Sequence, residues 1–76
     1  MSIQISNDDV ADLPPSAKLV YLILQEGGEM TQAELRDRTT LPDRTVRYAL
    51  ERLDAAGVLR SRPSASDARQ SLYSIN

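Results

Sequence analysis

Residues 42–57 constrain the fold of this chain more than any other segment of its sequence. At about 3.6 residues per helical turn, its aliphatic residues fall on one stripe, as in a helix that packs on a core. These residues are Val46, Ala49, Leu50 and Leu53. Polar and charged residues with the same spacing, offset by two positions, fall on the opposite side: Arg44, Arg47, Tyr48 and Glu51. The sequence therefore predicts a helix that buries one face and presents arginine and tyrosine near its N-terminus.

The residues at the two ends of this segment are typical of helix boundaries. Pro42 is tolerated in a first helical turn, so we expect it to open the helix. Asp43 follows it, and a carboxylate is favourable at the positive end of the helix dipole. Gly57 suits the left-handed position after a helix C-terminus. Arginines on the exposed face indicate DNA, because a guanidinium binds guanine edges and phosphates through two parallel hydrogen bonds.

The composition limits the chain to one small domain and narrows its chemistry. The core of these 76 residues must be aliphatic, because Phe and Trp are absent. Cys and His are absent too, so zinc sites and the common nucleophile–base pairs lack their usual members. We therefore expect no enzyme, no metal and no cofactor. No apolar run is long enough for a membrane span and no secretory signal is visible, which predicts a cytoplasmic protein without a membrane partner.

The formal net charge of −2 conceals an uneven distribution of charge along the chain. Residues 1–34 hold one basic and six acidic residues, whereas residues 35–76 hold eight arginines and five acidic residues. The basic half contains the predicted helix with the exposed arginines, so the positive field and the candidate binding surface coincide. The alternative is that these arginines form a solvated, salt-bridged surface. The excess of arginine over lysine in an acidic chain resembles haloarchaeal proteins.

The first half of the chain predicts an arm and a buried helix. Residues 1–12 have the composition of an N-terminal arm or tail. Ser16 is placed to cap a helix, and we expect Pro15 to lie outside that helix. An apolar helical stripe follows and ends at the Gly27–Gly28 pair: Ala17, Val20, Tyr21 and Leu24. Other apolar residues make this helix apolar nearly all round, so we expect it to be deeply buried or to meet a partner chain.

A second helix is predicted over residues 32–38, before a turn at residues 39–41. Thr31 and Glu34 have the spacing of a capping box, and Met30 is placed to pack against Leu35. Both features are typical of a helix that begins at a defined residue.

After the third helix the apolar period changes to that of strands. Strands are expected at residues 58–62 and 72–75, and the segment between them has the polar composition of a turn. Three helices followed by a β-hairpin make a winged helix-turn-helix, an α+β fold that is mainly α. We assign this domain to residues 13–76 and the arm or tail to residues 1–12.

The order and spacing of these elements resemble the multiple-antibiotic-resistance regulator (MarR) family and related archaeal winged-helix regulators. The resemblance extends over residues 14–75. It is carried by residues 30–35 in the second helix, 41–53 in the recognition helix, 56–59 before the wing, and 67–69, which match the family's Asp-x-Arg wing motif. The resemblance implies a transcriptional regulator, expected to be a repressor, that binds double-stranded DNA sequence-specifically.

In the family's binding mode, the third helix enters the major groove and the wing meets the adjacent minor groove. The resemblance implies major-groove contacts from Arg44, Thr45, Arg47 and Tyr48. It also implies a minor-groove contact from Arg69, with Asp67 either orienting that arginine or capping the turn. Thr31 and Gln32 are expected to meet phosphate. Four charged neighbours complete the DNA-binding candidates: Asp43, Arg52, Arg60 and Arg62. Of these, Arg60 and Arg62 share one face of the wing, toward phosphate or water.

MarR proteins usually carry further helices at both ends, which build the dimer and an effector pocket. Here about a dozen residues precede the first helix and the chain ends after the wing, so we expect no small-molecule effector. A homodimer is still expected, and it would need another surface. The candidates for that surface are Ile3, Ile5, Leu19, Leu22 and Ile23.

Two other interpretations of the third helix stay open at this point. In the first, Arg44 and Arg47 pair with Asp43 or Glu51 at helical spacing, a contact that contributes only ~0.2–0.5 kcal/mol. In the second, the winged helix is a protein-interaction module without direct DNA binding, which fits the acidic net charge. Such a module should expose apolar residues on this helix, whereas the apolar stripe is needed for the core.

Overall fold

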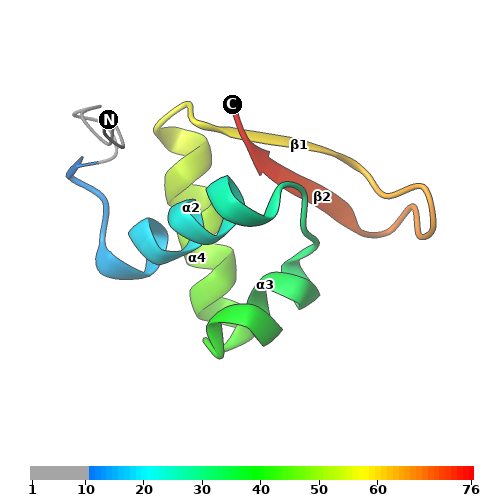
Figure 1. Ribbon diagram of the computed structural model, residues 1–76, viewed down its shortest axis with the longest axis horizontal. Helices are drawn as coiled ribbons and strands as arrows, with labels where there is room; N and C mark the ends of the chain where they lie inside the picture. Colours follow the sequence, from blue (N-terminus) through cyan, green and yellow to red (C-terminus); the bar gives the residue numbers. More distant parts are fainter. Residues whose placement is uncertain (1–10) are drawn as a thin grey trace.

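The computed structural model describes residues 11–76, in which three helices are followed by one β-hairpin (Figure 1). The helices are α2 (Pro15–Gly27), α3 (Gln32–Thr39) and α4 (Asp43–Ala55). The strands β1 (Leu59–Pro63) and β2 (Ser71–Ile75) pair antiparallel. The predicted winged helix-turn-helix, mainly helical, is therefore confirmed. The division between an arm at residues 1–12 and the domain stays a prediction, because residues 1–10 lie outside the described part.

α2 and α4 pack against each other and carry most of the core (Figure 1). The predicted stripe of α2 is buried: Ala17, Val20, Tyr21 and Leu24. The predicted stripe of α4 is buried as well: Val46, Ala49, Leu50 and Leu53. Leu35 of α3 and Met30 before it join the same cluster, as the staple predicted. Full burial of one aliphatic side chain contributes about 1.5–3 kcal/mol, so these residues hold α4 in place while its other side stays exposed.

α2 begins earlier than the sequence predicts. Pro15 is its first residue and Pro14 is its N-cap, so the prediction that Ser16 caps the helix and Pro15 lies outside it is wrong. The first turn of a helix has no intrahelical acceptor for its N–H groups, so a proline, which lacks that group, fits there at little cost. The other end agrees with the prediction, because Gly28 follows the last helical residue with φ of 79°.

α3 begins with the predicted capping box. The Thr31 hydroxyl accepts a hydrogen bond from the backbone N–H of Glu34 (3.1 Å), and the Glu34 carboxylate accepts one from the backbone N–H of Thr31 (2.8 Å). The helix extends one residue beyond its predicted end, to Thr39, whose buried hydroxyl donates to the carbonyl of Leu35 (2.7 Å). The chain then turns at Thr40, whose φ of 58° lies in the left-handed region. This tight turn joins α3 to α4 without a longer loop.

α4 begins at Asp43, with Pro42 as its N-cap rather than as its first residue. The Pro42 carbonyl accepts hydrogen bonds from the backbone N–H groups of Thr45 (2.9 Å) and Val46 (3.0 Å). At the other end, Gly57 has φ of 78°, as predicted for the residue that follows a C-cap. Within residues 11–76, no helix is both long enough and apolar enough to cross a membrane.

The wing differs from its prediction in its boundaries and in one contact. β1 is shifted by one residue and β2 begins one residue earlier than predicted. A contact that the sequence did not predict ties the wing to the helices, because Met30 and Tyr73 form a β-bridge. The N–H of Met30 donates to the carbonyl of Tyr73 (3.0 Å), and the N–H of Tyr73 donates to the carbonyl of Met30 (2.8 Å). The middle of β2 is thereby fixed beside the N-terminus of α3.

Candidate nucleic-acid interface

The exposed face of α4 carries the side chains predicted to contact DNA. Arg44 and Arg47 are exposed, Tyr48 is 46% exposed, and Thr45 is partly buried. Neither arginine forms an ion pair with another residue of the described part of the chain. The alternative in which they pair with Asp43 or Glu51 is therefore not found there, and both guanidinium groups are accessible.

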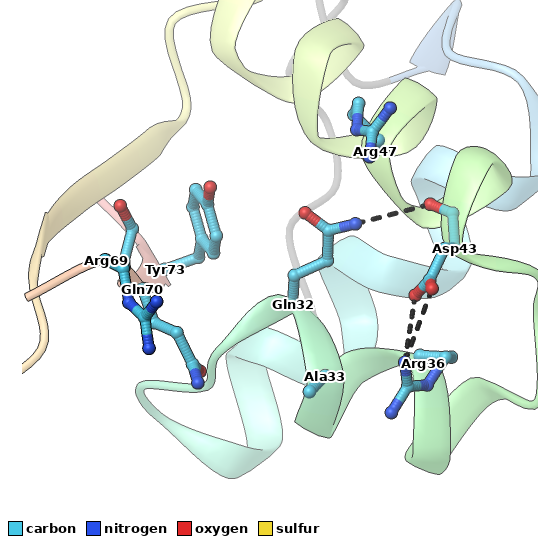
Figure 2. Close-up of a pocket in the computed structure, with 9 residues that line it drawn as sticks. Gln32, Ala33, Arg36, Asp43, Arg47, Arg69, Gln70 and Tyr73 are labelled. Carbon is cyan, nitrogen blue, oxygen red and sulfur yellow. Dashed lines mark hydrogen bonds and ion pairs between the residues drawn. The ribbon is translucent and has the colours of Figure 1, made fainter. Parts of the chain in front are cut away.

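Asp43, the first residue of α4, is paired with Arg36 of α3 (Figure 2). The Nη1 of Arg36 lies 3.2 Å from Oδ1 and 3.4 Å from Oδ2 of this carboxylate. The Nε2 of Gln32 donates to the backbone carbonyl of Asp43 over 3.4 Å. These contacts join α3 to the N-terminus of α4, and they compensate the negative charge of Asp43 beside the exposed arginines.

A shallow groove of about 300 Å³ lies between these two helices and the wing. Figure 2 shows side chains that line it from all three elements: Gln32, Arg36, Asp43, Arg47, Arg69 and Tyr73. Three of its lining residues are arginines and one is acidic, so the groove carries a positive charge. Two predicted DNA contacts from distant parts of the sequence, Arg47 and Arg69, are therefore brought to the same groove.

The tip of the wing presents Arg69 with its side chain 92% exposed. The Asp67 carboxylate accepts a hydrogen bond from the backbone N–H of Arg69 (3.0 Å) and lies 3.6 Å from the Nε of the same residue. The backbone N–H of Gln70 donates to the carbonyl of Asp67 (2.9 Å), which closes the turn. Asp67 therefore both caps the turn and contacts the guanidinium, the two arrangements that the sequence left open.

The strand arginines make contacts within the chain. The Nε of Arg60 donates to Oδ1 of Asn76 (3.1 Å). Arg62 forms a bidentate ion pair with Glu29, in which the Nε–Oε2 and Nη2–Oε1 distances are both 2.6 Å. Hydrogen bonds from Arg62 lower the pKa of the Glu29 carboxyl, and the same hydrogen bonds raise the pKa of the Arg62 guanidinium. The sequence did not predict this pair, because its members lie 33 positions apart and no local pattern links them.

Of the predicted DNA contacts, Gln32, Asp43, Arg47 and Arg69 line the groove, and the others lie outside it. Arg52 lies on the last turn of α4 and lines a separate hollow with Asp12 and Leu13. Thr31 is partly buried at the N-cap of α3, where its hydroxyl already accepts the capping hydrogen bond. The structure therefore separates Arg52 from the other DNA-binding candidates and gives Thr31 a structural role.

The residues predicted to form a dimer contact differ in how exposed they are. Leu19 and Leu22 of α2 are 39% and 40% exposed, respectively. Ile23 is partly buried and packs against the core. Ile3 and Ile5 lie outside the described residues. Among residues 11–76, no three acidic side chains come together as ligands for a metal ion.

Comparison with models of known protein families identifies the family of this winged helix. Residues 11–70 match the MarR family, and the chain belongs to that family. A search among curated protein sequences found no match.

Solved structures share the fold. A probable transcriptional regulator from Pseudomonas aeruginosa is 27% identical, with a TM-score of 0.82 over 93% of this chain and 54% of that protein. A Cys-to-Ser mutant of MarR from E. coli, complexed with operator DNA, is 19% identical, with a TM-score of 0.79 over 92% and 51%. BpsR of Bordetella bronchiseptica, whose DNA binding is regulated by 6-hydroxynicotinic acid, is 24% identical, with a TM-score of 0.80 over 87% and 47%. The chain thus spans about half the length of these proteins.

Proposed function

We propose that this chain is a sequence-specific, DNA-binding transcriptional regulator that acts as a repressor. One observation carries the proposal: α4 seals the core on one side and presents Arg44 and Arg47, without an ion-pair partner among residues 11–76, on the other. The wing adds Arg69 to the groove that Arg47 lines. Membership of the MarR family supports the same function.

In this proposal the first two turns of α4 enter the major groove. The N-terminal residues of a recognition helix contact base edges, and Arg44, Thr45, Arg47 and Tyr48 occupy that part of α4. An arginine there binds the O6 and N7 atoms of guanine through two hydrogen bonds. The wing then meets the adjacent minor groove, where a narrow groove concentrates negative potential and attracts Arg69. At the N-terminus of α3, Gln32 meets a phosphate with support from the positive end of the helix dipole.

We also propose a homodimer whose two α4 helices lie about 34–36 Å apart on one face of the duplex. The exposed pair Leu19 and Leu22 on α2 is the candidate contact within the described residues. A DNA target implies a cytoplasmic location, and a chain without cysteine is suited to that compartment. The archaeal source stays a prediction from the composition and the resemblance.

The alternative function, a protein-interaction module, has less support. Such a module would offer apolar side chains on α4, but the aliphatic stripe of that helix is buried. Within residues 11–76, the one large apolar side chain of α4 that is exposed is Tyr48. The accessible surface of α4 is therefore dominated by charge.

Selection of bound sites from a random double-stranded DNA library, with the purified chain, tests the proposal directly. We expect enrichment of a defined sequence, and a two-fold symmetric consensus if the chain binds as a dimer. Light scattering on the free protein and on its complex gives the number of chains independently. Failure to enrich any sequence at any salt concentration would contradict DNA-binding specificity.

A further inference from the structure

The ion pair between Glu29 and Arg62 joins the wing to the helical part of the molecule. Glu29 lies between α2 and α3, and Arg62 lies near the tip end of β1. Among residues 11–76, it is the only ion pair that links the wing to the helices. The others lie within α3, join α3 to α4, or lie within the wing tip. Within the described residues, no other ion pair joins the wing to the segment between α2 and α3.

The ion pair acts on the same stretch of the wing as the β-bridge. Met30, which forms the bridge, follows Glu29 directly, and its partner Tyr73 lies next to Leu72, the residue opposite Arg62 in the hairpin. β1 is exposed from its second residue onward, whereas every residue of β2 is partly buried and Tyr73 packs against the core. The ion pair therefore gives β1, the more exposed strand, a contact of its own, in addition to the packing of β2 and the two backbone hydrogen bonds of the bridge.

We infer that Glu29 is a positioning residue for DNA binding, because through Arg62 it holds the wing where Arg69 and Arg47 can contact one duplex together. The inference rests on the proposed DNA-binding function and deepens it. It gives Arg62 an internal role in place of the predicted position on a wing face toward phosphate or water. The hydrogen bonds from Arg62 also lower the pKa of the Glu29 carboxyl, so the carboxylate stays charged to a lower pH than that of an ordinary glutamate.

Two variants that each remove one negative charge distinguish the positioning role of Glu29 from a general electrostatic effect on DNA binding. Glu29→Gln and Glu26→Gln remove the same charge, and Glu26 is an exposed residue of α2 without an ion pair among residues 11–76. General repulsion from DNA predicts that both variants bind equally well or more tightly. Positioning predicts that Glu29→Gln alone binds the duplex selected by the native chain roughly ten-fold more weakly, the scale of one lost groove contact.

A charge exchange tests whether the pair itself is needed. Glu29→Arg combined with Arg62→Glu keeps the net charge and restores an ion pair of opposite orientation, so it should recover most of the affinity that Arg62→Glu loses. In the Glu29→Gln background, Arg69→Ala should reduce affinity less than it does in the native chain, because the wing is already displaced. If the exchanged pair binds as weakly as Arg62→Glu alone, Arg62 contacts phosphate itself and the inference is wrong.

A measurement without DNA keeps the two proposals apart. NMR residual dipolar couplings of residues 69–73 relative to α4, with amide hydrogen exchange of Tyr73, report the position and stability of the wing. We expect Glu29→Gln to change these couplings and to speed the exchange, whereas Glu26→Gln changes neither. Unchanged couplings and exchange in Glu29→Gln would overturn the positioning role. If no DNA sequence is selected, the proposed function fails, and this measurement still decides whether Glu29 fixes the wing.

Discussion

Arg47→Ala separates the DNA contact from the stability of the fold. Arg47 is exposed, has no ion-pair partner among residues 11–76, and is not part of the buried stripe of α4. Surface substitutions of this kind change the free energy of unfolding by less than about 0.5 kcal/mol. For a domain of this size, that corresponds to a change in Tm of at most ~4 °C. We therefore expect a variant that folds as the native chain does.

The expected effect on DNA binding is much larger. A bidentate arginine–guanine contact supplies about 1–3 kcal/mol of discrimination, which is roughly a 5- to 150-fold loss of affinity for the selected sequence. If Arg47 instead contacts phosphate, the loss should be the same for every sequence. In that case the slope of log affinity against log salt should also become shallower by about one. The two kinds of contact are therefore distinguishable in one set of titrations.

Fluorescence anisotropy with the selected duplex and with a scrambled duplex, at several salt concentrations, measures both quantities. Arg38→Ala is the matched control, because Arg38 is an exposed arginine in the last turn of α3 and is not among the residues that line the groove. It should change the affinity by less than about three-fold, as expected of a charge outside the contact surface. Equal losses in Arg47→Ala and Arg38→Ala would refute the assignment of the α4 face to DNA.

Three further predictions concern the fold and the wing contact. Leu53→Ala removes a fully buried side chain of α4 and should lower the free energy of unfolding by about 2–5 kcal/mol in urea titration; a loss below 1 kcal/mol would contradict its place in the core. Thr40→Asn should raise the same free energy by roughly 0.5–1 kcal/mol, because Asn tolerates the left-handed φ of 58° better than a β-branched residue does, and no gain would argue against strain there. The Glu29–Arg62 pair should be intact above pH 4.5, the ordinary pKa of Glu29, and should be lost as pH falls through the lowered value. A ¹³C-carboxyl NMR titration of Glu29 measures the pKa of this group, whose charged neighbours include Glu34, Asp37 and Arg38. A midpoint at or above pH 4.5 would contradict the prediction.

Local patterns in the sequence predicted most of the fold, because each depends on residues a few positions apart. The stripes of α2 and α4 followed from helical periodicity, and the start of α3 from the spacing of Thr31 and Glu34. The errors lie at the ends of elements. At the start of α2, for example, both Pro15 and the following Ser16 are residue types that suit a helix N-terminus, so the sequence did not decide between them. Backbone hydrogen bonds decide such ends, and composition constrains them only loosely.

The exposure of the predicted residues on α4 could be predicted from the sequence, whereas their contacts within the chain could be predicted much less well. The exposed arginines of α4 and the Asp67–Arg69 contact followed from spacing and from the wing motif. The Glu29–Arg62 pair depends on where two distant segments meet, and no local pattern records that. Arg52 is different, because it lies four residues after Tyr48 on the same side of α4, and its place in the last helical turn separates it from the predicted contacts near the N-terminus.

The two outer edges of the wing sheet are each protected from pairing with another chain. A strand edge with free N–H and C=O groups is a template for aggregation. On β2, the bridge to Met30 occupies the outward-facing backbone groups of Tyr73, in the middle of the strand. On β1, the exposed edge strand carries two charged side chains and ends at Pro63, which has no N–H to offer. The hairpin can therefore project from the domain and remain accessible to a large ligand without recruiting strands from neighbouring copies in a crowded cell.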